Sequence, residues 1–477
     1  MAAPDGPLVI GVDSSTQSTK VLVVDTATGS VVARGQAPNV VTPAHDSDPE
    51  QWWDALAQAL AQCGPAAQQA AAVSVAGQQH GLVTLDAEGR PVRNALLWND
   101  TRSAPQRDRL IDELGGPAAW AERTGSVPAP SFTVTKWAWL AEHEPEAAAA
   151  TRAVRLPHDY LTGRLTGQGV AGGTTDRGDA SGSGWWSSAT ERYDEEILAH
   201  VGLDPALLPR VVASGEPAGT ARSGLPLPEG ILVAAGTGDN MAGALGLGLG
   251  PGRPVLSLGT SGTVYAVGER RTTDASGIVA GFADARHDWL PLACTLNCTQ
   301  AVDRFATLLG LDREAVEPGG SAVVLPFLDG ERTPDLPYAS GLVHGLRHGT
   351  TGGQLLQAAY DGAVFALLRA LDLVLDDAAD PTEPILLIGG GARGTAWRET
   401  VRRLSGRPVK VPAADELVAI GAAAQAAGLL LGRDPAAVAR DWGTTEGESL
   451  RAVERDDDAL SRLDATLAGA DALLRQR

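Results

Sequence analysis

Lysine is nearly absent from this sequence of 477 residues, which contains only Lys20, Lys136 and Lys410. A P-loop requires a lysine that is followed by serine or threonine. None of the three lysines has such a neighbour, so the sequence excludes a P-loop. The motif set of protein kinases is missing as well. A nucleotide, if one binds, must therefore be held by a different kind of loop.

Cysteine is equally rare, with three residues in the whole chain. Three cysteines cannot build a disulfide framework, so we expect a protein of the reducing cytoplasm. Cys294 and Cys298 are four residues apart, a spacing that would place them on one helical face. No histidine or third cysteine lies near enough to complete a zinc site. We interpret both as small residues of the core.

Long apolar runs and clustered positive charge are also lacking. No apolar run reaches 18 residues, and the first residues have neither the basic start nor the apolar stretch of a signal peptide. The formal net charge is −20, from 38 basic and 58 acidic residues. Nucleic acids and anionic lipids need clustered cations, so we expect neither a nucleic-acid partner nor a membrane partner.

The apolar pattern predicts an α/β fold. Apolar strands alternate with helix-patterned segments along the chain, which is typical of layered α/β architecture. The predicted helices cover 51–63, 136–150, 354–377 and the charged tail after about residue 450, and a buried strand covers 71–77.

Two similar hairpins open the two halves of the chain. Residues 8–25 and 255–269 each combine an apolar strand, a turn of small polar residues and a second strand. A join rich in glycine and proline, 243–254, precedes the second hairpin. This repeat predicts a duplicated α/β domain with a cleft between the copies. We expect the domains to cover residues 1–245 and 246–477.

Three turns rich in glycine, serine and threonine follow buried strands, at 13–19, 259–263 and 389–394. Small side chains let backbone N–H groups approach an anion closely, and hydroxyl groups add donors. Asp13 would repel a phosphate unless a divalent cation stood between them, and Mg²⁺ prefers one or two carboxylates together with phosphate oxygens. The turns therefore predict a phosphate site with Asp13 at the metal. As an isolated residue, Asp13 could simply form a turn.

The third turn contains the spacing G-x-G-x-x-G at Gly389, Gly391 and Gly394, and Asp415 or Glu416 follows at a suitable distance. This is the context of a dinucleotide-binding turn. The chain that remains is too short to supply the strands of such a domain. We therefore favour a turn that faces a nucleotide; a nicotinamide site and a purely structural turn are the alternatives.

A carboxylate suited to acid–base chemistry follows the apolar strand near residue 234. The segment VAAGTGDNMAGALG (233–246) predicts a strand, a turn and the start of a helix, with Asp239 at the turn. Ligands of α/β sheets bind at this edge, where Asp239 could act as general base toward a hydroxyl group. Aspartate is equally common as a helix N-cap, which is the structural alternative.

Two further segments place polar groups at strand ends. VAGQQHGLV (75–83) supplies Gln78, Gln79 and His80, and ALLWNDTRS (95–103) supplies Trp98, Asn99, Asp100 and Arg102. An aromatic surface with amide, imidazole and carboxylate groups suits a ligand with many hydroxyl groups. His80 alone would more often be a structural histidine, and only the grouping favours a site.

These segments together resemble the FGGY family of carbohydrate kinases. The similar motifs are GVDSSTQSTK, GQQHGLV, LLWNDTR, LPHDYLTGRLTG, TTDRGDASGSGWW, AAGTGDNMAGALG, LSLGTSGTV, LPFLDGERTP and IGGGARGTAWRETV, in the family's order from residue 9 to about 425. The resemblance implies two actin-like (ribonuclease-H-type) domains that close over ATP and a sugar. It is greatest to members that phosphorylate D-xylulose at its 5-hydroxyl with ATP and Mg²⁺. It is also compatible with a homodimer.

The resemblance also implies a role for individual residues. Asp239 becomes the general base. The sugar contacts are Gln79, His80, Trp98, Asn99, Asp100, Asp239 and Asn240. Asp13 lies at the metal, and the nucleotide contacts are Ser15, Thr16, Gln17, Gly259, Thr260, Ser261, Gly390, Gly391 and Ala392.

The sequence departs from the family at two places. Ser15 and Ser18 stand where relatives commonly carry glycine, and Gln79 stands where many kinases of D-xylulose carry methionine. A kinase of another pentulose or polyol, such as ribulose, fuculose or glycerol, is therefore the nearest alternative. An actin-like or chaperone-like ATPase switch is the alternative from another class.

Overall fold

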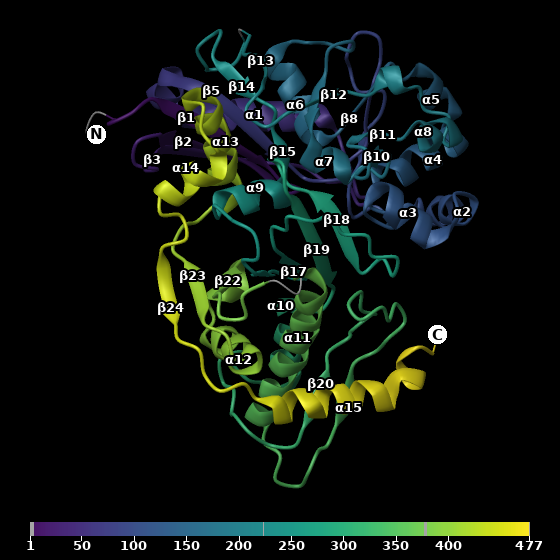
Figure 1. Cartoon of the computed structure of the whole chain (residues 1–477), viewed down its shortest axis with the longest axis vertical. Coiled ribbons are helices and arrows are strands. Elements are labelled where there is room, and N and C mark those ends of the chain that lie inside the picture. The colour runs from purple at the N-terminus through teal and green to yellow at the C-terminus, as the bar shows by residue number, and fades with distance from the viewer. Residues whose placement is uncertain (1–3, 223, 376–378, 477) are drawn as a thin grey trace.

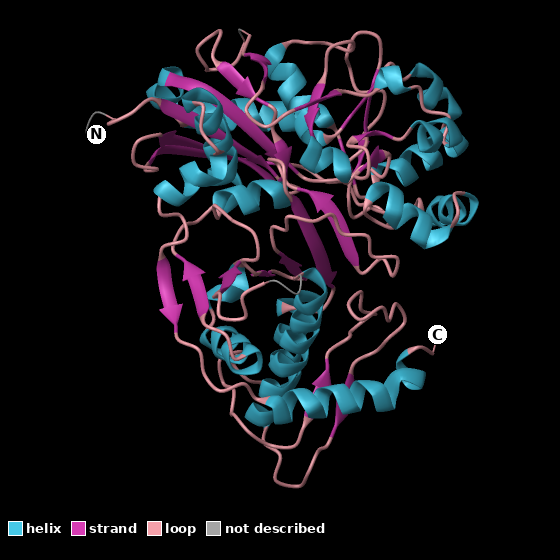
Figure 2. Cartoon of the chain, viewed as in Figure 1, coloured by secondary structure: helices cyan, strands magenta, loops and turns pink. Residues whose placement is uncertain are grey.

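The computed structural model describes residues 4–222, 224–375 and 379–476 of the chain, which form two large sheets with helices packed around them (Figures 1 and 2). The N-terminal sheet contains β1 (Leu8–Ser14), β2 (Ser18–Asp25), β3 (Val31–Pro38), β5 (Ala70–Gly77), β13 (Pro217–Thr220), β14 (Leu232–Ala234) and β15 (Thr237–Gly238). The C-terminal sheet contains β16 (Val255–Leu258), β17 (Gly262–Tyr265), β18 (Val279–Ala283), β19 (Trp289–Thr295), β22 (Ile385–Ile388), β23 (Val409–Pro412) and β24 (Gly447–Leu450).

The two sheets repeat one topology. The N-terminal order is β13-β14-β5-β1-β2-β3, with β15 also paired to β5, and the C-terminal order is β18-β19-β17-β16-β22-β23-β24. In each sheet the opening hairpin is antiparallel, and its first strand pairs in parallel with a strand that arrives later in the chain. The duplicated α/β domain predicted from the two hairpins is therefore confirmed.

Short strand pairs and helices complete both halves. The strand pairs are β4 (Asp46–Ser47) with β7 (Ala95–Leu96), β6 (Val83–Leu85) with β8 (Ala153–Arg155), β9 (Thr174–Asp176) with β12 (Arg210–Val212), β10 (Trp186–Ser187) with β11 (Arg192–Tyr193), and β20 (Val323–Leu325) with β21 (Leu342–His344). The α-helices before residue 250 are α1 (Pro49–Gln62), α2 (Ala104–Glu113), α3 (Gly116–Thr124), α4 (Thr133–His143), α5 (Pro145–Ala150), α6 (Pro157–Thr166), α7 (Arg177–Ser181), α8 (Glu195–His200) and α9 (Asp239–Gly246). Those after it are α10 (Thr299–Leu309), α11 (Gly352–Val374), α12 (Thr395–Ser405), α13 (Leu417–Leu431), α14 (Pro435–Asp441) and α15 (Asp457–Leu474).

Most of the predicted elements are present. The hairpin of β1 and β2, helix α1, strand β5, helix α11 and the closing helix α15 lie where the sequence predicted them; residues 376–377 of the expected 354–377 helix lie outside the described residues. The helix expected over 136–150 is instead two helices, because the chain turns at Glu144 and Pro145 then occupies the first turn of α5.

The join predicted over 243–254 starts later than expected, because residues 243–246 form the end of α9, where Gly246 packs against Leu417 of α13. One sequence prediction is wrong. Cys294 and Cys298 do not share a helical face, because Cys294 lies in β19 and Cys298 precedes α10. Cys298 is nevertheless buried in the core, and both thiols are free.

Helix α13 belongs to the C-terminal half of the sequence but packs against the N-terminal sheet (Figure 1). A Cβ atom at Gly11 of β1 would lie 2.0 Å from the carbonyl oxygen of Ala419, so the strand and the helix meet backbone to backbone. The Ser74 hydroxyl donates to Gln425 across the same contact, at 2.5 Å. This packing brings the start of α13 beside the first hairpin.

No single helix among the described residues is long and apolar enough to cross a membrane. Helices α13 and α14 pass that test only as a pair, which bends by 110° at the junction.

Candidate active site at the edge of the N-terminal sheet

Three strand ends of the N-terminal sheet bring the two predicted carboxylates together. Asp13 on β1 pairs with Ala76 on β5, and Ala76 pairs with Thr237 on β15. The strands run in parallel, so their carboxyl ends share one edge of the sheet, and Asp239 follows β15 directly. Asp239 is close enough to Asp13 to influence its ionisation.

Asp13 is buried and carries an oxygen without a partner. Its side chain is 6% exposed, and Oδ1 has no hydrogen bond among the described residues. Burial raises the pKa of Asp13 to about 7; Lys20 opposes this shift, and the negative charges of Asp239 and Glu416 add to it. Lys20 is itself paired with Glu416 at 2.6 Å. The acidic surroundings and the free oxygen fit a site that a divalent cation would complete.

Asp239 is not the cap of α9. Gly238 occupies the N-cap position, and Asp239 is the first helical residue, so the N-cap alternative is wrong. Burial raises the pKa of Asp239 to about 6, while hydrogen bonds from backbone N–H groups hold the shift back. A carboxylate with this pKa is ionised at neutral pH and can still accept a proton.

Gln79 and Asn240 are joined beside Asp239. The Asn240 side-chain amide donates to Gln79 Oε1 at 2.7 Å and to Asp239 Oδ1 at 3.1 Å, and the Asn240 backbone N–H donates to the same Oδ1 at 2.8 Å. Gln79 is buried, whereas Asp239 and Asn240 are half-buried. The three predicted sugar contacts therefore form one connected group.

His80 is held as a neutral imidazole at the same edge. It has a positive φ of 65°, Nδ1 lies 2.7 Å from the carbonyl oxygen of Gly182, and the ring stacks on Phe132 at 4.7 Å. Burial lowers the pKa of His80 to about 3, and the cations Lys136 and Arg332 lower it further. A neutral ring that donates through Nδ1 leaves Nε2 as an acceptor for a hydroxyl group.

Trp98, Asn99 and Asp100 differ in their exposure and in their partners. Trp98 is 47% exposed, and its Nε1 donates to the hydroxyl oxygen of Thr16 at 3.0 Å. The Asn99 amide nitrogen lies 3.2 Å from His45 Nδ1. Asp100 is buried and pairs with Arg102 at 2.7 Å. Trp98 is thus the exposed member of the three, and Asp100 is engaged by Arg102. Asn99 is half-buried, and its Oδ1 has no hydrogen-bond partner among the described residues.

The first turn is closed by its own hydroxyl groups. The Ser15 hydroxyl and backbone N–H both bond the carbonyl oxygen of Ser18, at 2.9 and 3.0 Å. The Thr16 hydroxyl donates to Gln78 Oε1 at 3.1 Å, and Gln17 is exposed. The side chain of Ser15 is therefore part of the turn and does not project from it.

The other two turns differ in how much they expose. Thr260 and Ser261 are exposed at the tip between β16 and β17, and Gly259 is half-buried. The third turn is the 3₁₀ segment Gly390–Arg393, in which Gly390 is exposed while Gly391 and Ala392 are buried. A Cβ atom at Gly391 would lie 2.8 Å from Leu258 and from Thr299. A glycine at position 391 is therefore needed for the packing of this turn against Leu258 and Thr299.

The sequence did not identify the residues that support His80 and Gln79. Phe132 and Gly182 hold the His80 ring, and Asp179 lies beside Gln79. These residues come from segments about 50 to 100 positions away in the chain, and no local pattern marks them. Only the motif TTDRGDASGSGWW contained part of this set.

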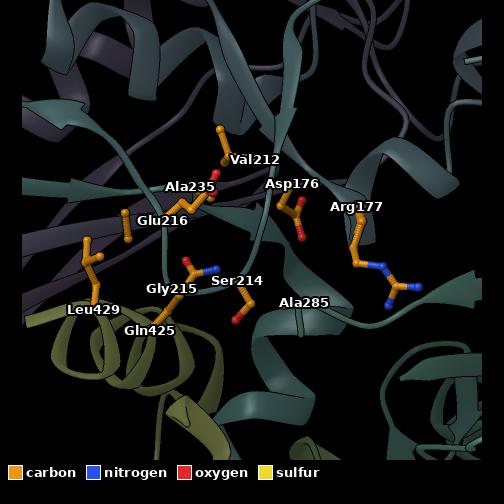
Figure 3. A pocket seen from close by; sticks show the side chains of 11 residues that line it. Asp176, Arg177, Val212, Ser214, Gly215, Glu216, Ala235, Ala285, Gln425 and Leu429 are labelled. Atoms are coloured by element: carbon orange, nitrogen blue, oxygen red, sulfur yellow. The ribbon is translucent and has the colours of Figure 1, made fainter. Parts of the chain in front are cut away.

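A narrow crevice behind this edge is lined by Asp176, Arg177, Val212, Ser214, Gly215, Glu216, Ala234, Ala235, Ala285, Gln425 and Leu429 (Figure 3). It has room for about one water molecule, and none of the predicted site residues lines it. It is therefore too small for a sugar or a nucleotide. No group of three or more metal-ligating side chains stands ready to bind a metal in the part of the chain that the structure describes.

Comparisons with known proteins agree along the whole chain. The N-terminal domain model of the FGGY family of carbohydrate kinases matches residues 8–246, and its C-terminal domain model matches residues 255–429. The chain is 74% identical to a xylulose kinase from Streptomyces rubiginosus, over 100% of this chain and 99% of that one. It is 73% identical to a xylulose kinase from Streptomyces coelicolor, with the same coverage. A crystal structure of xylulose kinase from Bifidobacterium adolescentis superposes with a TM-score of 0.88 at 36% identity, covering 97% of this chain and 99% of that one.

Proposed function

The chain belongs to the FGGY family of carbohydrate kinases, and we propose that it transfers the γ-phosphoryl group of ATP to the 5-hydroxyl of D-xylulose. The observation that carries this proposal is the meeting of Asp13 and Asp239 at one sheet edge, with Gln79 and His80 beside them. The substrate assignment is supported by the similarity to the two Streptomyces xylulose kinases.

In this proposal Asp239 accepts the proton of the sugar hydroxyl, whose oxygen attacks the γ-phosphorus in line with the leaving group. A general base contributes about 10²–10⁴-fold to such a reaction. Asn240 fixes one oxygen of Asp239 through two hydrogen bonds, which leaves the other oxygen for the substrate. His80 Nε2 and the exposed face of Trp98 would hold the rest of the sugar.

The nucleotide contacts proposed are Ser15, Thr16, Gln17, Gly259, Thr260, Ser261, Gly390, Gly391 and Ala392. Of these, the exposed Gln17, Thr260, Ser261 and Gly390 are the most accessible to a ligand. Asp13 would hold Mg²⁺ together with the phosphate oxygens, since Mg²⁺ is commonly bound through one or two carboxylates and substrate phosphates. When bound, Mg²⁺ neutralises the negative charge that develops on the transferring group.

The proposal is tested by measuring ADP release from the purified chain with Mg²⁺ and ATP against D-xylulose, ribulose, fuculose and glycerol. Strong turnover on D-xylulose alone supports it. Turnover on ribulose, fuculose or glycerol instead would retain the assignment as a kinase and change the assigned substrate. Gln79 would then be the first residue to substitute. If no sugar raises ADP release above the basal rate, the ATPase-switch alternative replaces it.

Asp13→Asn is expected to raise the Mg²⁺ concentration needed for half-maximal activity by about tenfold or more, because one anionic ligand is lost. The variant should remain folded, because Oδ1 of the buried Asp13 has no hydrogen bond that the substitution could break. Magnesium titrations of both proteins at fixed ATP check this. Asp86→Asn, at an exposed turn far along the chain, is the matched control. An unchanged Mg²⁺ requirement would make Asp13 a turn residue only.

The pH dependence should follow Asp239. Because its pKa is raised to about 6, the base is available above that pH and is lost by protonation below it. We expect kcat/KM for the sugar, measured at saturating Mg²⁺ and ATP so that the metal keeps Asp13 ionised, to fall with unit slope below about pH 6. His80 does not titrate there, since its pKa is held at about 3. This fall at low pH, the acid limb of the profile, should therefore persist in His80→Asn. If it disappeared in that variant, the ionisation would belong to His80.

The domain boundary is proposed after residue 245, just before the last residue of α9. A cytoplasmic location is proposed as well, and the free thiols of Cys63, Cys294 and Cys298 are compatible with it.

A further inference from the structure

Four ionisable side chains meet in the interior behind Gln79. The His158 Nε2 atom lies 3.2 Å from Asp159 Oδ1, 3.3 Å from Asp179 Oδ2 and 3.6 Å from Asp176 Oδ1. Three of the side chains are 0% exposed, and that of Asp176 is 4% exposed. Burial lowers the pKa of His158 to about 3, which favours the neutral imidazole. Three carboxylates around a neutral ring in a dry interior cannot all be ionised, so the cluster must hold a proton.

Hydrogen bonds favour the ionised form of two of the three carboxyl groups, those of Asp176 and Asp159, whose pKa values burial raises to about 6 and about 7. Asp176 accepts the backbone N–H groups of Gly178 and Asp179, at 2.9 and 3.0 Å, and the Thr237 hydroxyl at 2.7 Å. Asp159 accepts the backbone N–H of Leu156 at 2.9 Å. Such bonds favour the ionised form. Among the described residues, Asp179 accepts no backbone N–H.

The nearby cations give the same assignment. Arg155 favours the negative charge of Asp159, and Arg177 favours that of Asp176. The pKa of Asp179 is raised well above its usual range, most strongly by burial and then by Asp176, Asp159 and Asp239, while the Gln79 amide opposes the shift. Asp179 is therefore the member of the cluster that is best able to keep the proton.

Asp179 is also the member that reaches the active site. A Cβ atom at Gly238 would lie 3.0 Å from Asp179 Oδ1 and 2.7 Å from Gln79 Cγ, so these side chains close around the residue that precedes Asp239. Gln79 Oε1 accepts from Asn240, which in turn bonds Asp239.

We propose that Asp179 is a positioning residue that works as a neutral carboxylic acid, anchoring Gln79 and through it Asn240 and Asp239. In this proposal the carbonyl oxygen of the acid accepts from Gln79 Nε2, and its O–H donates to His158 Nε2, which lies 3.3 Å from Asp179 Oδ2. Gln79 Nε2, His158 Nε2 and both Asp179 oxygens have no other hydrogen-bond partner among the described residues. A neutral acid fixes this chain of side chains without placing a second negative charge beside the base. The role of Asp239 in this inference rests on the proposed function; the protonation of Asp179 does not.

Difference infrared spectroscopy tests the protonation directly. The spectrum of the wild-type chain minus that of Asp179→Asn, at about pH 8 where exposed carboxyls are ionised, should show the carbonyl stretch of a protonated acid. Asp176→Asn is the matched control and should show only the loss of carboxylate bands. Loss of carboxylate bands in Asp179→Asn would overturn the proposal. If neither variant folds, a wild-type spectrum without any protonated-acid band at this pH would overturn it as well.

Kinetics test the positioning. Asparagine can replace both hydrogen bonds of the neutral acid, so Asp179→Asn should keep kcat within about threefold and leave the acid limb in place. Asp179→Leu has a similar volume but no polar atom, and should lower kcat by about 10-fold or more with little change in KM for ATP. A downward shift of the acid limb by about one pH unit in Asp179→Asn would mean that Asp179 is charged, contrary to the proposal. Because the infrared result does not require activity, failure of the kinase assignment would be recognised separately.

Discussion

Asp239→Asn is expected to lower kcat with D-xylulose by about 10²–10⁴-fold, the usual contribution of a general base. Asparagine keeps the shape of the side chain and can still accept from the Asn240 backbone N–H. It cannot take the proton of the sugar hydroxyl at neutral pH. The loss should therefore appear in the chemical step, with ATP binding and the folded state retained.

Steady-state kinetics and calorimetric titration with ATP check this result. Asp457→Asn provides a matched control, because Asp457 is also the first residue of a helix, α15, and is exposed on the surface. That variant should behave like the wild type. Loss of ATP binding in Asp239→Asn at unchanged stability would assign Asp239 to the nucleotide site. Retention of full turnover would exclude it as the base.

Gly421→Ala should destabilise the chain by about 3 kcal/mol, at the upper end of the range for overpacking. A Cβ atom at Gly421 would lie 1.8 Å from the carbonyl oxygen of Ala242, so α13 and α9 must separate or tilt. Asp239 is the first residue of α9 and would move with it. We therefore expect a kcat lower by about tenfold or more as well, because small displacements of reacting groups are costly.

Thermal unfolding and turnover are measured on the same preparation, with Gly469→Ala beside it. Gly469 lies in the exposed helix α15, and a Cβ atom there would meet no atom within 4 Å. The control should be stabilised by about 0.5–1 kcal/mol, since alanine is the better helix former. If Gly421→Ala matched its control in both measurements, the close crossing of α9 and α13 would not be needed for the site.

Much of the site could be predicted from local sequence patterns. The two hairpins, the duplication and the polar residues at strand ends depend on side-chain periodicity over a few residues. Asp13 and Asp239 were identified as candidates because each follows an apolar strand, and the carboxyl ends of parallel strands share one edge. The resemblance to the FGGY family added the roles, which local patterns alone leave open.

Other properties were decided only by contacts between distant segments. The Asn99 amide nitrogen lies close to His45, and Asp100 pairs with Arg102, so the expected sugar contact Asp100 is engaged by a protein partner. The sequence alone gave no reason to place α13 on the N-terminal sheet, because its apolar residues would suit any buried surface.

The sequence by itself determined the α/β class, the repeated hairpins and the residues able to carry the chemistry, because these follow from the spacing of apolar and polar side chains. Only the tertiary structure decided how these residues ionise and which of them contact one another. Burial raises the pKa values of Asp13 and Asp239, and hydrogen bonds join Asn240 to Gln79, a residue about 160 positions away in the sequence. Such contacts are fixed by the packing of whole elements, which no local pattern encodes.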